Sequence, residues 1–137
     1  MATLVDTNIL IDVFNHGSSF EEWSVSRLAE ARRDGAVIIN QIIYAEMAAG
    51  YATTASLEAA ISPNAFERED LPWEAAYAAG QAFIQYRRSG GDKRSPLPDF
   101  YIGAHAAIRG YRLLTRDPVR YRSYFPMVSI ISPETHP

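Results

Sequence analysis

Short runs of apolar residues alternate along the chain with longer stretches in which apolar side chains recur every three or four positions. The short runs predict buried strands, and the longer stretches predict amphipathic helices. Alternation of this kind favours an α/β fold, with a central, mostly parallel five-stranded sheet flanked by helices. The predicted strands are 2–5, 36–39, 65–71, 111–115 and 127–131, and the predicted helices are 8–15, 20–33, 41–50, 54–61, 73–88, 99–109 and 118–124.

The composition is that of an ordinary globular protein, since 47% of the 137 residues are hydrophobic and 21% are charged. A chain of this length is large enough for one core, so we expect a single domain over residues 1–137. The absence of cysteine excludes disulfides and thiolate metal sites. No apolar run reaches the roughly 20 residues that cross a bilayer, and no secretory signal is visible. We therefore expect a soluble, cytoplasmic protein without a membrane role.

The stretch LVDTNILIDVF, residues 4–14, places a carboxylate among bulky apolar side chains. Asp6 follows the first predicted strand, and a carboxylate in such a setting has to be hydrogen-bonded, protonated or matched by a cation. Asp117 follows the predicted strand 111–115 in the same way. Ligands of open parallel sheets gather at the carboxyl ends of the strands, so this edge is where a site is expected.

Each of these acids also has a purely structural explanation. Asp6 could cap the following helix, while Asp99 and Asp117 could each favour a helix N-terminus. Glu46 has no such task, because it lies in the middle of the predicted helix 41–50 on an apolar face. The alternative for Glu46 is a solvated side chain at the edge of that face.

If Asp6, Glu46, Asp99 and Asp117 converge, four carboxylates repel one another, and either some stay protonated or a divalent cation holds them. Oxygen ligands without cysteine or a histidine cluster suit Mg²⁺ or Mn²⁺ rather than Zn²⁺. A carboxylate-held Mg²⁺ in an open cleft is typical of phosphodiester hydrolysis. The acids therefore predict a metal-dependent hydrolase of phosphodiesters.

Two further polar residues are expected to play no part in this chemistry. Asp12 lies about one and a half helical turns beyond Asp6 and is expected to face solvent. His105 lies off the helix face that carries Asp99 and is expected to be a packed core histidine.

Four motifs stand in a fixed order along the chain: DTNILID near the start, a helical glutamate near residue 46, PDFYIGAHA, and GYRLLTRD followed by RYRSYFP. This pattern resembles the PIN-domain ribonucleases, specifically the VapC-type toxins, over nearly the whole chain. The resemblance implies a PIN-like fold and a Mg²⁺- or Mn²⁺-dependent endoribonuclease that leaves 5′-phosphate and 3′-hydroxyl ends. Such proteins are usually homodimers, held inactive by a VapB-type antitoxin. The catalytic acids implied are Asp6, Glu46, Asp99 and Asp117, the metal ligands among them are Asp6, Asp99 and Asp117, and the supporting contacts are Thr7, Asn8 and Thr115.

The sequence departs from this family at one place. Many relatives read TRN after the last core strand, with an acid three residues beyond the asparagine. Here the stretch is TRDPVRY, so that Asp117 takes the asparagine position and Arg120 takes the position of the acid. The fourth acid is therefore shifted rather than missing.

The charges are divided unevenly between the two halves of the chain. Before residue 80 there are 12 acids and 4 bases, whereas from residue 80 onward there are 4 acids and 9 bases. Basic residues near an acidic pocket would contact the phosphates of an RNA substrate, although they could equally form a solvated face. The candidates are Arg87, Arg88, Lys93, Arg94 and Arg116.

Large apolar residues are more numerous than one small core obviously needs. Trp23, Leu28 and the aromatic helix 73–86 predict a two-fold homodimer and an apolar groove for an antitoxin segment. A basic residue of that antitoxin could reach the acids and displace the metal.

Three other functions remain as alternatives. A PIN domain that has lost catalysis would only bind partners, although all four acids are present. A phospho-receiver domain would need a lysine after the last core strand, but Lys93 precedes a predicted helix. A haloacid-dehalogenase-like phosphatase would need Asp-x-Asp, and residues 6–8 read DTN.

Overall fold

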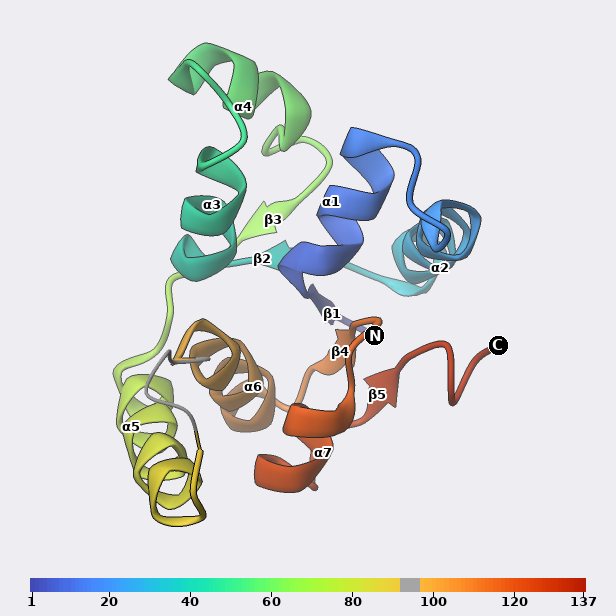
Figure 1. Ribbon diagram of the computed structural model, residues 1–137. Helices are drawn as coiled ribbons and strands as arrows, with labels where there is room; N and C mark the ends of the chain where they lie inside the picture. The colour runs from blue at the N-terminus through green and yellow to red at the C-terminus, as the bar shows by residue number, and fades with distance from the viewer. Residues whose placement is uncertain (92–96) are drawn as a thin grey trace.

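The structure is a computed structural model, and it describes residues 1–91 and 97–137. The expected α/β architecture is confirmed: five parallel strands form one sheet in the order β3-β2-β1-β4-β5, with helices on both faces (Figure 1). The strands are β1 Thr3–Val5, β2 Val37–Ile39, β3 Glu67–Arg68, β4 Arg112–Leu114 and β5 Ile130–Ile131, and the described helices are α1 Thr7–Asn15, α2 Glu21–Asp34, α3 Gln41–Ala48, α4 Thr54–Ala60, α5 Trp73–Arg88, α6 Leu97–Arg109 and α7 Val119–Tyr124.

The elements occur in the predicted order, but the two edge strands are shorter than predicted. Strand β3 keeps only two residues of the predicted 65–71, both of them exposed. Strand β5 begins at Ile130 instead of residue 127, because the backbone N–H of Val128 turns back to the carbonyl of Phe125. The central strands β1, β2 and β4 agree with the prediction to within a residue or two at each end because they are almost entirely buried.

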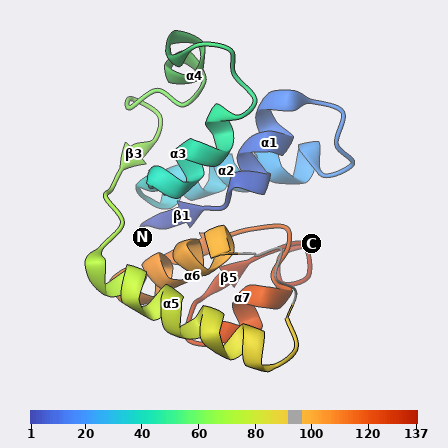
Figure 2. The same cartoon turned by 60° about the vertical axis from the view of Figure 1, so that its left-hand side comes forward.

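The direction of the connections decides which face each helix covers. Helices α1 to α4 accompany the chain from β1 outward to β3, and they lie on one side of the sheet in Figures 1 and 2. Helices α5 and α6 accompany its return to β4, and they lie on the other side with α7. Right-handed crossovers that run in opposite directions put their helices on opposite faces. The strand order reverses between β1 and β4, because the chain runs from β1 to β2 in one direction and from β4 to β5 in the other. Their carboxyl ends, at Val5 and Leu114, therefore open onto the crevice where such folds bind ligands.

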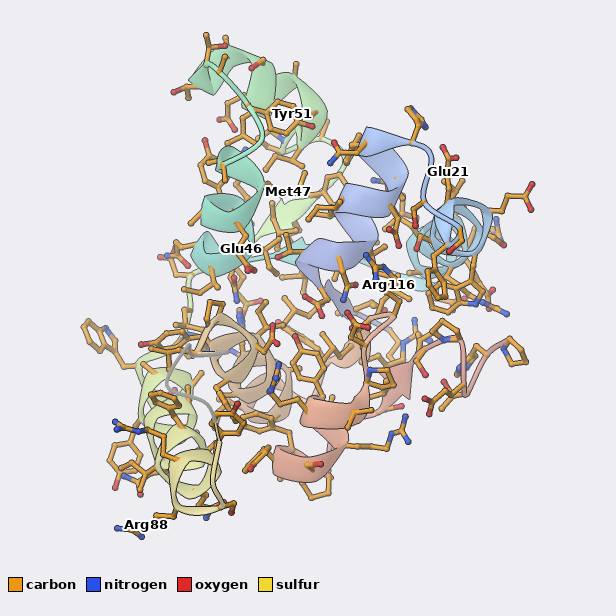
Figure 3. All side chains as sticks on the ribbon, in the orientation of Figure 1. Glu21, Glu46, Met47, Tyr51, Arg88 and Arg116 are labelled. Atoms are coloured by element: carbon orange, nitrogen blue, oxygen red, sulfur yellow. The ribbon has the colours of Figure 1, made fainter. Side chains whose placement is uncertain are left out.

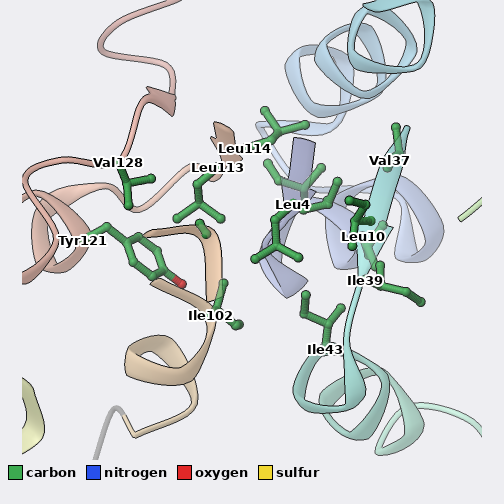
Figure 4. Close-up of a cluster of buried hydrophobic side chains, with 14 of the residues drawn as sticks. Leu4, Leu10, Val37, Ile39, Ile43, Ile102, Leu113, Leu114, Tyr121 and Val128 are labelled. Atoms are coloured by element: carbon green, nitrogen blue, oxygen red, sulfur yellow. The ribbon is translucent and has the colours of Figure 1, made fainter. Parts of the chain in front are cut away.

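The core lies on both faces of β1 and its two neighbours. Leu4 pairs with Ile38 on one side and with Leu113 on the other, and none of the three is more than 2% exposed. Apolar side chains from helices on both faces close over these strands (Figure 4). Burial on both faces explains why these strands read as continuous apolar runs rather than as alternating ones.

Helices α6 and α7 approach each other closely at Gly103. A Cβ at Gly103 on α6 would lie 2.5 Å from the ring of Phe125 and 3.0 Å from that of Tyr121. Any larger residue at this position would push α6 and α7 apart. The glycine therefore lets Asp99 at the start of α6 lie close to the residues of α7.

A buried polar cluster fixes helix α3 against α6. Asn40 caps α3, and its side-chain oxygen accepts hydrogen bonds from the backbone N–H groups of Ile42 and Ile43. Its amide nitrogen lies 2.9 Å from Nδ1 of His105, whose Nε2 lies 3.3 Å from Glu69. Because the amide donates, the histidine is neutral with its proton on Nε2, and burial lowers its pKa. His105 is thus the packed core histidine expected from the sequence.

Within the two described ranges, no helix combines the length and the apolar character that crossing a membrane requires.

Candidate active site

Asp6 lies at the carboxyl end of β1 and does not cap the helix that follows. It occupies the N-cap position of α1, yet its side chain makes no capping hydrogen bond. Its Oδ2 instead accepts hydrogen bonds from the hydroxyls of Thr115 at 2.8 Å and Tyr121 at 2.9 Å, and from the Asn8 amide at 3.2 Å. With only 5% of the residue exposed, Asp6 is a buried acid turned toward the crevice between β1 and β4.

The environment of Asp6 opposes its negative charge. Burial raises its pKa from 3.8 to about 7, and the charges of Asp99 and Glu46 add to the rise. The hydrogen bonds from Thr115 and Tyr121 act in the opposite direction. A buried carboxylate with a pKa near neutrality and acidic neighbours is typical of functional sites.

Glu46 comes to this site from the middle of α3. The hydroxyl of Thr7, on the first turn of α1, donates a 2.7 Å hydrogen bond to its Oε1. The residue as a whole is exposed, so the edge-of-face alternative describes its position correctly. Its pKa is nevertheless raised, first because atoms around the carboxylate exclude water and then because Asp99 is negative, while Thr7 opposes the rise. Glu46 is therefore an exposed acid held at the rim of the cluster.

Asp99 lies in the first turn of α6, between Asp6 and a basic residue that the sequence analysis did not assign to the site. Its Oδ2 is 2.6 Å from Nη1 of Arg120, and its Oδ1 is 3.5 Å from the Tyr121 hydroxyl. Burial raises its pKa, Arg120 and Tyr121 lower it, and the charge of Asp117 raises it again. Tyr121 thus bridges Asp6 and Asp99.

Asp117 is an exposed acid, with 73% of its side chain open to solvent. Its backbone N–H donates to the hydroxyl of Thr115 over 3.1 Å, and its Oδ2 lies 3.4 Å from the amide of Asn8. The three expected supporting residues, Thr7, Asn8 and Thr115, therefore all contact one or more of the acids. The structure brings the predicted set together at one edge of the sheet.

Asp12 does not face solvent, and that expectation is wrong. The residue is 1% exposed, and its Oδ2 accepts hydrogen bonds from Ser24 at 2.8 Å and from Nε of Arg116 at 2.9 Å. Helix α2 packs directly over this face of α1, so a position that looks peripheral on α1 alone is covered. The ring of Phe20 lies against the same guanidinium. The buried carboxylate of Asp12 therefore holds the side chain of Arg116, the residue that precedes Asp117.

The other basic candidates stand in different relations to the acids. Lys93 and Arg94 lie outside the described residues. Arg87 and Arg88 are exposed at the end of α5, and Figure 3 shows Arg88 at the far tip of that helix, away from Glu46 and Arg116. Arg116 is thus the described candidate that borders the acid cluster.

A cleft of about 580 Å³ opens beside the acids. Its walls include Asp99, Asp117, Arg116 and Arg120, with Tyr86 at one side.

Sequence reasoning did not assign Arg120 and Tyr121 to the site, although both lie in the RYRSYFP motif. Arg120 was noted as standing in the position of an acid, and this was the signal that could have led to it.

The four carboxylates supply hard oxygen donors that suit Mg²⁺ or Mn²⁺. Burial, together with the charge of neighbouring acids, raises the pKa values of Asp6, Glu46 and Asp99. Among residues 1–91 and 97–137, however, no three acid, histidine or cysteine side chains stand close enough together to hold an ion as they are. The donor set fits a divalent cation by its chemistry, and binding one requires the side chains to move closer.

Comparison with known proteins agrees with this architecture. The family model of the PIN domain matches residues 3–124. Among solved structures, VapBC2 from Rickettsia felis bound to a promoter DNA fragment has a TM-score of 0.73 at 17% identity, and the match covers 96% of this chain and 98% of the other. VapBC-1 from nontypeable Haemophilus influenzae gives 0.72 at 18% identity, with the same coverage. A toxin–antitoxin complex from Klebsiella pneumoniae gives 0.63 at 23% identity, covering 96% of this chain and 97% of the other. A search of curated proteins finds no match.

Proposed function

Because the chain belongs to the PIN domain family, we propose that it is a Mg²⁺- or Mn²⁺-dependent endoribonuclease, and the toxin of a VapBC-type toxin–antitoxin pair. The observation that carries the proposal is the environment of Asp6. This buried carboxylate caps no helix, faces the crevice between β1 and β4, and has other acids as neighbours. Such an arrangement costs stability in the free protein and is explained by a cation that neutralises it.

The proposed site contains two kinds of side chain: acids that would bind the metal ion, and polar residues that orient those acids. Asp6 and Asp99 would be the principal metal ligands, with Asp117 completing the set from the solvent side and Glu46 acting partly through water. Thr115, Tyr121 and Asn8 fix the orientation of Asp6, and Thr7 fixes that of Glu46. When bound, the cation would polarise the scissile phosphate and make water a better nucleophile.

The reaction proposed is hydrolysis of an RNA phosphodiester by in-line attack of water. A bond forms between the water oxygen and phosphorus, and the bond from phosphorus to the 3′ oxygen breaks. Glu46, which is exposed and has a raised pKa, is placed to take the proton of the water, and the departing 3′ oxygen gains one from solvent. The products carry 5′-phosphate and 3′-hydroxyl ends.

The test is cleavage of RNA by the purified chain with Mg²⁺ or Mn²⁺, with excess EDTA, and with metal restored after EDTA. Cleavage should stop in EDTA and return with the metal. Undiminished cleavage in EDTA would contradict the metal requirement, and 2′,3′-cyclic phosphate ends would show attack by the substrate's own 2′-hydroxyl. If RNA is bound but never cleaved, the chain is an inactive binding module.

The proposed partners are a VapB-type antitoxin and a second copy of the chain. Support for the antitoxin comes from the solved structures of similar fold that contain VapBC complexes.

Support for a homodimer comes from one face of α5, where Trp73 is 90%, Tyr77 72% and Ile84 43% exposed. Leu28, which was expected to add to such a surface, is 3% exposed and belongs to the core. Light scattering at tens of micromolar should give a dimer, and replacing Trp73 and Tyr77 by alanine should give a monomer; a native monomer would refute the dimer and leave catalysis untouched.

A further inference from the structure

Arg120 makes the shortest polar contact described for Asp99. Its Nη1 lies 2.6 Å from Oδ2 of that carboxylate, and both side chains are about one-third exposed, at 38% and 33%. A basic side chain is therefore paired with one of the proposed metal ligands.

The position of the guanidinium suits more than an ion pair. It lies over the ring of Tyr86, with its central carbon 5.7 Å from the ring centroid, and it lines the 580 Å³ cleft beside Asp117. An arginine has five N–H donors in a planar fork, and one of them is committed to Asp99. Arg120 is thus a wall residue of a cleft that opens beside the acid cluster.

Asp99 cannot serve Arg120 and a divalent cation equally well with the same oxygen. Among the described residues, no three acids stand close enough together to hold an ion, and Oδ2 of Asp99 accepts a 2.6 Å hydrogen bond from Arg120. Ligation of a metal through Oδ2 would require Arg120 to leave, and ligation through Oδ1 would weaken the ion pair, because two positive charges would share one carboxylate.

We infer that Arg120 is a phosphate-contacting residue of the proposed nuclease, held on Asp99 in the free protein and released to the RNA backbone when Asp99 binds the metal. The inference rests on the proposed function. Once released, the guanidinium remains over Tyr86 at the wall of the cleft. Arginine suits this task, since its fork matches a phosphate through two parallel hydrogen bonds. The competing account is a purely structural ion pair that never leaves Asp99.

The first measurement is the affinity for Mn²⁺, by calorimetry, of the native chain, Arg120→Gln and Arg122→Gln. Arg122 lies on the same helix but pairs with Glu134, so it is the matched control. Arg120→Gln should bind Mn²⁺ up to roughly fivefold more tightly, the limit for a partly exposed ion pair, and Arg122→Gln should match the native chain. Equal affinity of all three would overturn the competition, whereas no binding by any of them would instead refute the proposed metal site.

The second measurement is the salt dependence of binding to a short fluorescent single-stranded RNA, in EDTA and in Ca²⁺, which takes oxygen ligands and replaces Mg²⁺ for a binding assay. In EDTA the native chain and Arg120→Gln should have the same slope, because Arg120 is held by Asp99. In Ca²⁺ the native slope should be steeper by about one unit than that of Arg120→Gln. A structural ion pair predicts the same slope for both proteins in Ca²⁺, and that result would overturn the phosphate contact.

Discussion

The hydroxyl of Tyr121 lies 2.9 Å from Oδ2 of Asp6, a contact that joins the first strand to the last described helix across 115 residues of sequence. The hydrogen bond favours the charged carboxylate and so holds down a pKa that burial raises to about 7. Tyr121→Phe keeps the ring and removes the donor. The pKa of Asp6 should rise by about one unit more, and the acid limb of the pH–rate profile should move to higher pH by a similar amount. Tyr124→Phe on the same helix is the control, and an acid limb that moves in neither variant would show that Asp6 does not govern the profile.

The raised pKa of Asp6 has a consequence for stability in the absence of metal. A carboxyl whose pKa is higher in the folded state than in the unfolded state stabilises the fold when protonated, and this contribution is lost as pH rises from about 4 through about 7. Each unit of pKa difference corresponds to about 1.4 kcal/mol, so the loss can reach about 4 kcal/mol. Asp6→Asn stays neutral throughout. In EDTA, its free energy of unfolding relative to the native chain should therefore increase between pH 5 and pH 8, as measured by urea denaturation. A difference that does not change with pH would contradict the raised pKa.

The ion pair between Asp12 and Arg116 should behave as a coupled unit. Its carboxylate is 1% exposed and its guanidinium 27% exposed, so removing either partner disturbs a largely desolvated contact. A double-mutant cycle with Asp12→Ala and Arg116→Ala should give a coupling energy between about 0.5 and 3 kcal/mol. Additive effects of the two changes on the free energy of unfolding would show that the pair contributes nothing of its own.

Arg116 should also contact the RNA backbone, because it borders the acids and lines the cleft. In EDTA, where cleavage is blocked, Arg116→Gln should weaken RNA binding and flatten its salt dependence by about one unit of slope. Arg33 is a matched control, since it is exposed near the end of α2. That helix ends just before β2, so Arg33 lies near the amino ends of the strands, whereas the acids lie at the carboxyl ends. If both variants bind like the native chain, Arg116 serves only to anchor its loop. Thermal melting of each variant under the same conditions separates lost binding from lost folding.

Local sequence patterns were sufficient for those features that depend on neighbours along the chain. The apolar runs were enough to predict the three central strands, whose side chains are almost entirely buried. The acids could be grouped because parallel strands bring their carboxyl ends to one edge. Here the topology, rather than any contact visible in the sequence, made Asp6 and Asp117 neighbours.

The features that sequence reasoning missed all depend on contacts between distant segments. Asp12 looks peripheral on its own helix, and only the packing of α2 over α1 buries it. Tyr121 reads as one aromatic residue among several until the close approach at Gly103 brings α7 against α6. Arg120 was visible as a departure from the family pattern, but its pairing with Asp99 could not be inferred without the relative placement of the two helices.

The most direct test of the proposed active site is Asp99→Asn, compared with Glu74→Gln. Both acids lie in the first turn of a helix, α6 and α5 respectively, but Glu74 is exposed and lies outside the acid cluster. Asparagine serves a helix N-terminus about as well as aspartate, so a merely structural Asp99 would tolerate the change. With Mg²⁺ or Mn²⁺ present, we predict that Asp99→Asn remains folded and cleaves RNA no faster than background, while Glu74→Gln cleaves like the native chain. Equal cleavage by the two variants would contradict the assignment of the acids as a metal-binding active site.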